Sequence, residues 1–275
     1  MTSTLQDWVG RTEEAEDVLT SALVQRFAAV LGLPSARAAA GDPAPPGIHW
    51  CLAMAVLPAG GLGEDGHPAL GGFLPPVPSG RRMWAGGTIR TLGPMRVGAT
   101  IRRASRVASI EMKEGRSGPL CFVAVDHTYS DGGAAVVSER HDIVYRGGGQ
   151  AGAGQQQPCS LPETKAAVTV ATTPTLLFRY SALTFNGHRI HYDLPYARDV
   201  EGYAGLVVHG PLQATWMLHL AQSLLGKVPE YFRFRGVRPL ICGDVAGIGA
   251  TREVGALRLS VRDGEGGTTM LAEAG

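Results

Sequence analysis

The stretch Thr184-Phe185-Asn186-Gly187-His188-Arg189-Ile190-His191-Tyr192-Asp193 places two histidines, an aspartate and a turn-forming Asn-Gly pair within ten residues. Eighteen positions after His191, a second polar group follows at His209-Gly210-Pro211, and the apolar segment 212–224 comes directly behind it. Proline is tolerated in the first turn of a helix, so this segment is predicted to be a helix enclosed by other structure. A polar loop ahead of a buried helix is a common place for an active site.

The rest of the second half predicts short helices and antiparallel strands around this stretch. Residues 174–183 are predicted to form a helix that the Asn-Gly pair ends. Alternating apolar and polar residues predict strands over residues 165–172, 231–241, 253–262 and 268–272.

The first half predicts the same plan of helix followed by strands. Thr12 and the four acids after it resemble a helix cap and an acidic first turn, and apolar residues at helical spacing continue to Leu31. A short buried helix is expected within residues 48–57, and the Gly/Pro-rich tract 58–80 is expected to be a long connection. Four strands are expected over residues 82–90, 98–113, 119–130 and 134–146.

Charged pairs on two of these strands are expected to face solvent. They are Asp126-His127 and Glu139-Arg140-His141-Asp142, for which a solvated sheet face is the default interpretation. The low-complexity segment 147–163 is predicted to link two domains, residues 1–146 and 164–275. Helices followed by antiparallel strands predict an α+β fold rather than a βαβ nucleotide-binding unit.

The composition excludes several classes of protein. A net charge of +1 gives no electrostatic reason to bind nucleic acid or an anionic membrane surface. No window approaches the ~20 apolar residues of a membrane span, and the N-terminus carries no signal-peptide pattern. The four cysteines, Cys51, Cys121, Cys159 and Cys242, are far apart in the sequence and predict neither disulfides nor a zinc ribbon. A cytoplasmic location is therefore expected.

The runs 181–193 and 202–212 resemble MaoC-type hot-dog dehydratases, in particular the type-2 hydroxyacyl-thioester dehydratase branch that includes mesaconyl-C4-CoA and itaconyl-CoA hydratases. Arg82-Met83-Trp84-Ala85-Gly86-Gly87 resembles the N-terminal domain of that branch. The resemblance implies a double hot-dog fold, in which two antiparallel sheets, each wrapped around a long helix, join. It further implies a first domain that supplies the acyl and CoA cavity without catalysing, and a homodimer.

The motif of the wider family is Asp-x-Asn-Pro-x-His, in which the Asp and the His share a water molecule. Laid on this sequence, its His falls on His191, its Asp on Asn186, its Asn on His188 and its Pro on Arg189. Because an amide cannot ionise, Asn186 is expected to orient the water without taking its proton.

Hydration of a double bond conjugated to a thioester needs a base for water and a group that holds the enolate-like oxygen. His191 is the expected base, because imidazole titrates near neutral pH. The Gly210 N–H at the start of the apolar helix is the candidate for the thioester oxygen. Substrate contacts are assigned to Arg82, Trp84, His188, Arg189 and His209.

A dicarboxylyl thioester would also need a cation for its free carboxylate, and the candidates are Arg82, Arg90 and Arg189. Structural roles compete with several of these assignments. The Asn-Gly pair has the residue types of a simple turn, glycine at 210 is also explained by lack of space, and three polar side chains of the loop are well suited to hold it together: His188, Arg189 and Asp193.

A metal site is disfavoured. His188-x-x-His191-x-Asp193, completed by His209, has suitable ligand types, but no helical register aligns the first two in an Asn-Gly turn. No metal is expected, and no cofactor apart from CoA as a part of the substrate.

The sequence therefore predicts reversible hydration of a 2-enoyl-CoA thioester. Branch resemblance favours a branched C5 dicarboxylyl-CoA, itaconyl-CoA or mesaconyl-C4-CoA, hydrated to citramalyl-CoA. Two alternatives stay open: an (R)-3-hydroxyacyl-ACP or -CoA dehydratase of fatty-acid metabolism, and a non-catalytic module that binds acyl thioesters.

Overall fold

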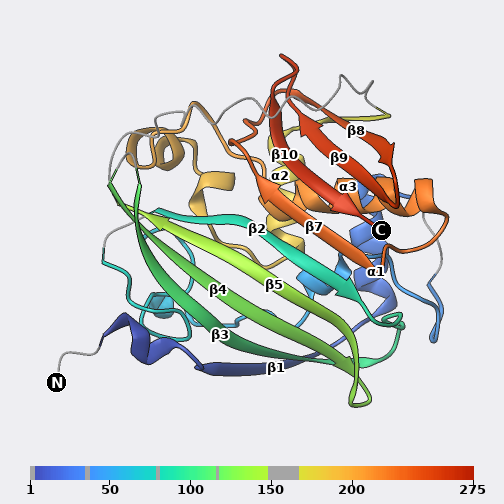
Figure 1. Cartoon of the computed structure of the whole chain (residues 1–275), viewed down its shortest axis with the longest axis horizontal. Coiled ribbons are helices and arrows are strands. Elements are labelled where there is room, and N and C mark those ends of the chain that lie inside the picture. The colour runs from blue at the N-terminus through green and yellow to red at the C-terminus, as the bar shows by residue number, and fades with distance from the viewer. Residues whose placement is uncertain (1–3, 35–37, 79–80, 116–117, 148–166) are drawn as a thin grey trace.

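The computed structural model of the chain describes residues 4–34, 38–78, 81–115, 118–147 and 167–275. Their strands form one antiparallel sheet in the order β1-β3-β4-β5-β2-β7-β10-β9-β8-β6. The first half of the chain supplies β1 to β5, and the second half supplies β6 to β10. Three α-helices lie on one side of this sheet, behind the strands in Figure 1. The α+β class is confirmed, and so is the joining of two antiparallel sheets.

In the first half, the helix α1 (Ser21–Leu31) begins after Thr20, whose hydroxyl accepts a hydrogen bond from the Leu23 N–H, and ends at the left-handed Gly32. The four predicted strands are confirmed with small shifts of their ends. They are β2 (Arg81–Thr91), β3 (Thr100–Gly115), β4 (Gly118–Asp131) and β5 (Ala134–Arg146), and the strand β1 (Thr12–Val18) precedes them.

In the second half, both predicted helices are confirmed as α2 (Pro174–Leu183) and α3 (Gly210–Leu225). The strands are β6 (Val168–Ala171), β7 (Tyr231–Gly236), β8 (Val245–Glu253), β9 (Ala256–Arg262) and β10 (Thr268–Ala274). The predicted strand 231–241 ends early at Gly236, and β8 was not predicted, because its Gly- and Ala-rich sequence carries little β-propensity.

The predicted helix start at Thr12 is wrong, because this segment is the edge strand β1. Each residue from Thr12 to Val18 pairs with β3, and two of its acids meet arginines there. Glu13 accepts a hydrogen bond from Arg103 at 2.7 Å, and Glu14 pairs with Arg102. Cross-strand pairing has overridden the local helix signal.

The two halves join where β2 runs antiparallel to β7, with Gly86 opposite Arg235 and Gly87 opposite Phe234. Neither glycine has room for a side chain: a Cβ on Gly86 would lie 2.5 Å from the Phe234 carbonyl oxygen, and one on Gly87 would overlap the Arg140 carbonyl oxygen. Glycine at positions 86 and 87 is thus required by the close approach of β2, β5 and β7.

The two halves cover the inner face of the sheet differently. In the second half, α3 packs against β7, β8, β9 and β10 and buries Leu212, Met217 and Leu218 almost completely. In the first half, α1 packs on α2 and on the short 3₁₀ helix Ile48–Cys51, which replaces the expected longer helix. Residues of the Gly/Pro-rich tract complete the first-half core; they are Phe73, Leu74 and Val77.

The predicted linker 147–163 lies almost wholly outside the described residues. The domain boundaries therefore stay predictions. The homodimer stays a prediction as well. No helix in the described part of the chain is long and apolar enough to cross a membrane.

Gly87→Ala tests the crowding at the β2–β7 junction. The added methyl group must displace the Arg140 backbone or the Phe234 ring, so we expect a loss of about 1–3 kcal/mol in the free energy of unfolding. The measurement is the denaturant midpoint. Gly93→Ala is the control, because its Cβ would meet Val136 at an ordinary 3.7 Å. Equal midpoints for the two variants would contradict the close approach.

Candidate active site

His191 is held as a neutral imidazole with one free nitrogen. It ends the short 3₁₀ helix Arg189–His191 and is buried. Its Nδ1 lies 2.7 Å from the Val207 carbonyl oxygen, which only accepts, so Nδ1 carries the proton and Nε2 keeps its lone pair. Burial, followed by the neighbouring His209 and His188, holds the pKa of His191 well below its usual range. The ring is therefore neutral and presents the lone pair of Nε2 as a hydrogen-bond acceptor.

The His209 ring packs against the His191 ring. The two rings stack with centroids 3.6 Å apart, and the fully buried His209 bonds to the Ser181 hydroxyl through Nε2 at 2.8 Å. Burial lowers the pKa of His209 to about 3. Its assignment as a substrate contact stays a prediction, but its place in the structure is that of a support for the base.

Gly210 is the first residue of α3, so its N–H has no acceptor within the helix. The Trp84 indole of β2 covers this residue so closely that a Cβ on Gly210 would lie 2.8 Å from Trp84 Cε3. The structure thus brings together two predicted site residues from different halves. The free N–H and the positive end of the helix dipole favour a developing negative charge here.

Asn186 takes part in the turn that leads to His191. Its Oδ1 accepts a hydrogen bond from the His188 N–H at 3.0 Å, and its own N–H donates to the Ser181 carbonyl. Phe185 before it adopts a left-handed backbone, with φ of 48°. The side-chain amide oxygen of Asn186 therefore already accepts a hydrogen bond within the loop. The role of Asn186 in orienting water stays a prediction.

The guanidinium of Arg189 is held by several contacts within the protein. Its guanidinium donates to Asp193 from Nε and Nη2 at 3.0 and 2.8 Å and lies over the Tyr196 ring. Its Nη1 donates to the Glu64 carbonyl, and its backbone N–H donates to the Asp65 carbonyl. These bonds match the alternative in which Arg189 and Asp193 hold the loop together.

Among the candidate cations, Arg82 is the one beside the loop. Its charge contributes to the lowered pKa values of Asp65 and His67. Burial raises the pKa of the nearby Tyr145, and the charge of Arg82 opposes this rise. Arg90, by contrast, is exposed and lies over the Tyr231 ring.

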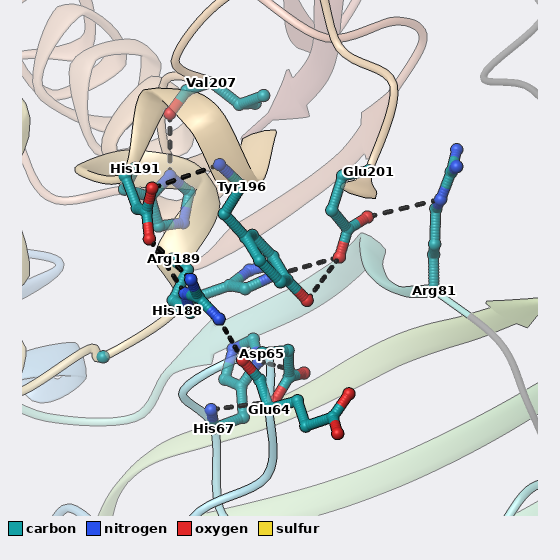
Figure 2. A network of polar contacts seen from close by, with 12 residues as sticks. Glu64, Asp65, His67, Arg81, His188, Arg189, His191, Tyr196, Glu201 and Val207 are labelled. Atoms are coloured by element: carbon teal, nitrogen blue, oxygen red, sulfur yellow. Dashed lines mark hydrogen bonds and ion pairs between the residues drawn. The ribbon is translucent and has the colours of Figure 1, made fainter. Parts of the chain in front are cut away.

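The sequence interpretation missed an aspartate and a histidine that the first half contributes. Figure 2 shows Asp65 and His67 beneath His188 and Arg189 of the loop 186–193. His67 Nδ1 lies 2.9 Å from Asp65 Oδ2, and the His67 ring lies 4.1 Å from that of His188. The ring of His188 in turn lies 5.4 Å from that of His191. The signal was the polar run 63–67 inside the tract taken for a connection.

Glu201 was also missed. It is buried, with one carboxylate oxygen 3.8 Å from His188 Nε2 and the other 3.4 Å from Arg81 Nε. Figure 2 shows it on the opposite side of His188 from Asp65 and His67. The buried His188 is thus flanked by a carboxylate of the second half and a histidine of the first.

The expected solvated face on β4 and β5 is wrong in part, because strand alternation turns only some of these residues outward. Asp126, Arg140 and Asp142 are exposed. Glu139 is buried, accepts the Trp50 Nε1–H at 2.7 Å, and lies 2.8 Å from His141 and 3.4 Å from His49. Burial alone would raise the pKa of Glu139, but these histidines hold it well below its usual range.

Within the part of the chain that the structure describes, one group of donor atoms could share a metal ion: those of Asp65, His67 and His188, which lie within 4.8 Å of one another. They are not the set considered from the sequence, since His191 uses Nδ1 on Val207 and Asp193 binds Arg189. The nearby positive charge of Arg82 disfavours a cation at this place.

Comparison with known proteins identifies the relatives of this chain. Residues 47–242 match the family model of hydroxyacyl-thioester dehydratase type 2. The chain is 46% identical to a mesaconyl-C(4)-CoA hydratase of Chloroflexus aurantiacus over 235 residues, which cover 85% of this chain and 84% of that protein.

Solved structures support the same fold. The crystal structure of HtdX of Mycobacterium tuberculosis matches with a TM-score of 0.67 and 18% identity, covering 96% of this chain and 99% of that one. A second protein of that organism, described as having a double hot-dog fold, matches with a TM-score of 0.57 and 15% identity over 97% and 95% of the two chains. The double hot-dog prediction is confirmed, and the chain belongs to the hydroxyacyl-thioester dehydratase type 2 family.

Proposed function

We propose that this protein reversibly hydrates a branched C5 dicarboxylyl-CoA whose double bond is conjugated to the thioester. The observation that carries the reaction is the neutral His191, with Nε2 free, stacked on the residue that precedes the N-terminus of α3. A base and an oxyanion-binding N–H are the two groups that the reaction requires.

In the proposed mechanism, His191 Nε2 takes one proton from water while the water oxygen bonds to the β-carbon. The electrons of the double bond move onto the thioester oxygen, which accepts a hydrogen bond from the Gly210 N–H. The His191 imidazolium then returns the proton to the α-carbon, and the C=O bond re-forms. The overall change is addition of one water molecule, and the reverse sequence is dehydration.

The substrate class rests on two supports. The relative that is 46% identical over most of both chains is named for mesaconyl-C4-CoA hydration. Arg82 supplies a cation beside the loop, whereas Arg189 is already paired with Asp193. We assign Arg82 to the free carboxylate and Trp84 to the wall of the acyl cavity. On the sequence alone, we also propose a cytoplasmic homodimer that takes CoA in preference to acyl carrier protein and needs no further cofactor.

A panel of enoyl thioesters tests the function, with loss of enoyl-thioester absorbance as the readout. We expect turnover of mesaconyl-C4-CoA, whose double bond is conjugated to the thioester, above crotonyl-CoA and a long straight chain. His191→Ala should lose ~100-fold or more in kcat, the scale of a lost general base. Dominant turnover of long straight chains would favour the (R)-3-hydroxyacyl dehydratase, and binding without any turnover would favour the non-catalytic module.

The pH profile of kcat/KM tests the state of His191. The neutral imidazole is the active form and its pKa is lowered, so activity is lost only as the pH falls below the usual histidine range. We expect kcat/KM to stay level as the pH is lowered from ~8 through ~6.5, the ordinary pKa of histidine. An acid limb centred at ~6.5 or above would contradict a depressed pKa.

Arg82→Met tests recognition of the free carboxylate. A charge-assisted hydrogen bond contributes ~1.5–3 kcal/mol, so KM for the C5 dicarboxylyl substrate should rise by roughly tenfold to hundredfold. KM for crotonyl-CoA, which has no free carboxylate, should change little. Arg90→Met is the matched control, since Arg90 lies over Tyr231. An equal rise in KM for both substrates would contradict the assignment.

A further inference from the structure

The Trp84 indole, which covers Gly210, packs against the rings of Phe234, Trp50 and His141. It stacks on Phe234 with ring centroids 4.6 Å apart, and it meets Trp50 and His141 edge to face at 5.7 and 5.6 Å. Phe234 belongs to β7 and His141 to β5, the two strands that flank β2. Stacked and edge-to-face contacts are favoured geometries of aromatic rings, so these neighbours fix the position of the indole.

The carboxylate of Glu139 contacts two of these neighbours at once. Its Oε1 accepts a hydrogen bond from Trp50 Nε1–H at 2.7 Å and also lies 2.8 Å from His141 Nε2. Burial alone would raise the pKa of Glu139, but His141 and His49 hold it well below its usual range, so the carboxylate is ionised. The hydrogen bond from Trp50 is therefore charge-assisted, which makes it stronger than a bond between neutral groups.

His141 is held on its other side as well. Its Nδ1 lies 3.2 Å from His127 Nε2, and His127 Nδ1 lies 2.8 Å from the Ser105 hydroxyl. Ser105, His127 and Glu139 are buried and lie opposite one another on β3, β4 and β5. Apolar residues of similar volume often stabilise a fold as well as a buried ion pair does. The contacts of Glu139 with the neighbours of Trp84 indicate a role in placing the indole.

We propose, on the basis of the hydratase function proposed above, that Glu139 is a positioning residue that holds the Trp84 indole over the Gly210 N–H through Trp50 and His141. A Cβ on Gly210 would lie 2.8 Å from Trp84 Cε3, so the indole directly contacts the first residue of α3. Excluding water from this N–H strengthens its interaction with negative charge on the thioester oxygen. A displaced indole admits water and weakens this interaction in the transition state.

The kinetic experiment compares Glu139→Leu, Glu139→Gln and Trp50→Phe with the wild type, using the best enoyl thioester of the panel. Glu139→Leu removes the acceptor at similar volume, and Trp50→Phe removes the donor but keeps a ring. Both should lower kcat by roughly tenfold to hundredfold, the scale of a misplaced group at a reacting centre, with a smaller change in KM. Glu139→Gln keeps an acceptor oxygen for Trp50 and should recover most of the loss.

Trp8→Phe is the matched control for the loss of an indole hydrogen bond. Trp8 Nε1–H donates to the Gly72 carbonyl oxygen at 3.1 Å, and its ring packs on a separate cluster of the core. This variant should keep the kcat of the wild type. A wild-type kcat for both Glu139→Leu and Trp50→Phe would overturn the inference.

A double-mutant cycle with Trp84→Phe distinguishes positioning from a general loss of stability. If Glu139 acts through the Trp84 indole, then Glu139→Leu and Trp50→Phe should each cost little further kcat once Trp84 is replaced. Losses that multiply independently would contradict the proposal, and Trp50→Phe carries this test if Glu139→Leu fails to fold.

The indole ¹⁵N–¹H NMR spectrum reports the same contacts without any substrate. The Trp84 signal, identified by its loss in Trp84→Phe, should shift in Trp50→Phe and Glu139→Leu and stay in place in Trp8→Phe. An unshifted Trp84 signal in the first two variants would overturn the hold of Glu139 on this indole. A shifted signal in a protein whose wild type turns over no thioester would instead overturn the proposed function, so the two failures are distinguishable.

Discussion

The antiparallel contact of β2 with β7 is the constraint on which the candidate site depends. It joins two five-stranded sheets into one, and it fits only because Gly86 and Gly87 carry no side chains. The same strand carries Trp84, so pairing β2 with the second half brings this indole against Gly210 at the start of α3. The N-terminal end of α3, where we propose that the thioester oxygen binds, is therefore covered by a residue of the other half.

A second contact between the halves sets the electrostatics of the site. The loop around Gly66 closes on the loop around Gly187, so that His67, His188, His191 and His209 lie in a row. Burial of several imidazoles side by side disfavours their charged forms, because each added charge would be both desolvated and repelled. The site therefore holds His67, His191 and His209 as neutral imidazoles, because burial lowers the pKa of each. The first half thus contributes polar side chains, Asp65 and His67, to the candidate site.

Local signals made part of this structure predictable. The helices α2 and α3 were predicted from sequence because hydrophobic periodicity, and for α3 a proline in the first turn, act over a few residues. The residues of the candidate site on 186–193 and 209–210 were found by resemblance, and their roles stay predictions. Pairing between distant strands could not be predicted from the sequence. The acidic segment β1 has the residue types of a helix start, but in the structure its acids pair with Arg102 and Arg103 of β3. Asp65 and His67 were missed for the same reason, since Arg189 and His188, which they contact, lie more than a hundred residues further along the chain.

The central claim is that His191 is a neutral base with its proton on Nδ1. The most direct measurement is a ¹⁵N NMR spectrum of the histidine side chains at neutral pH, with the His191 signals assigned by their loss in His191→Gln. The account predicts a neutral ring with protonated Nδ1 and unprotonated Nε2, because Nδ1 donates to the Val207 carbonyl. An imidazolium, or a neutral ring protonated on Nε2, would contradict it.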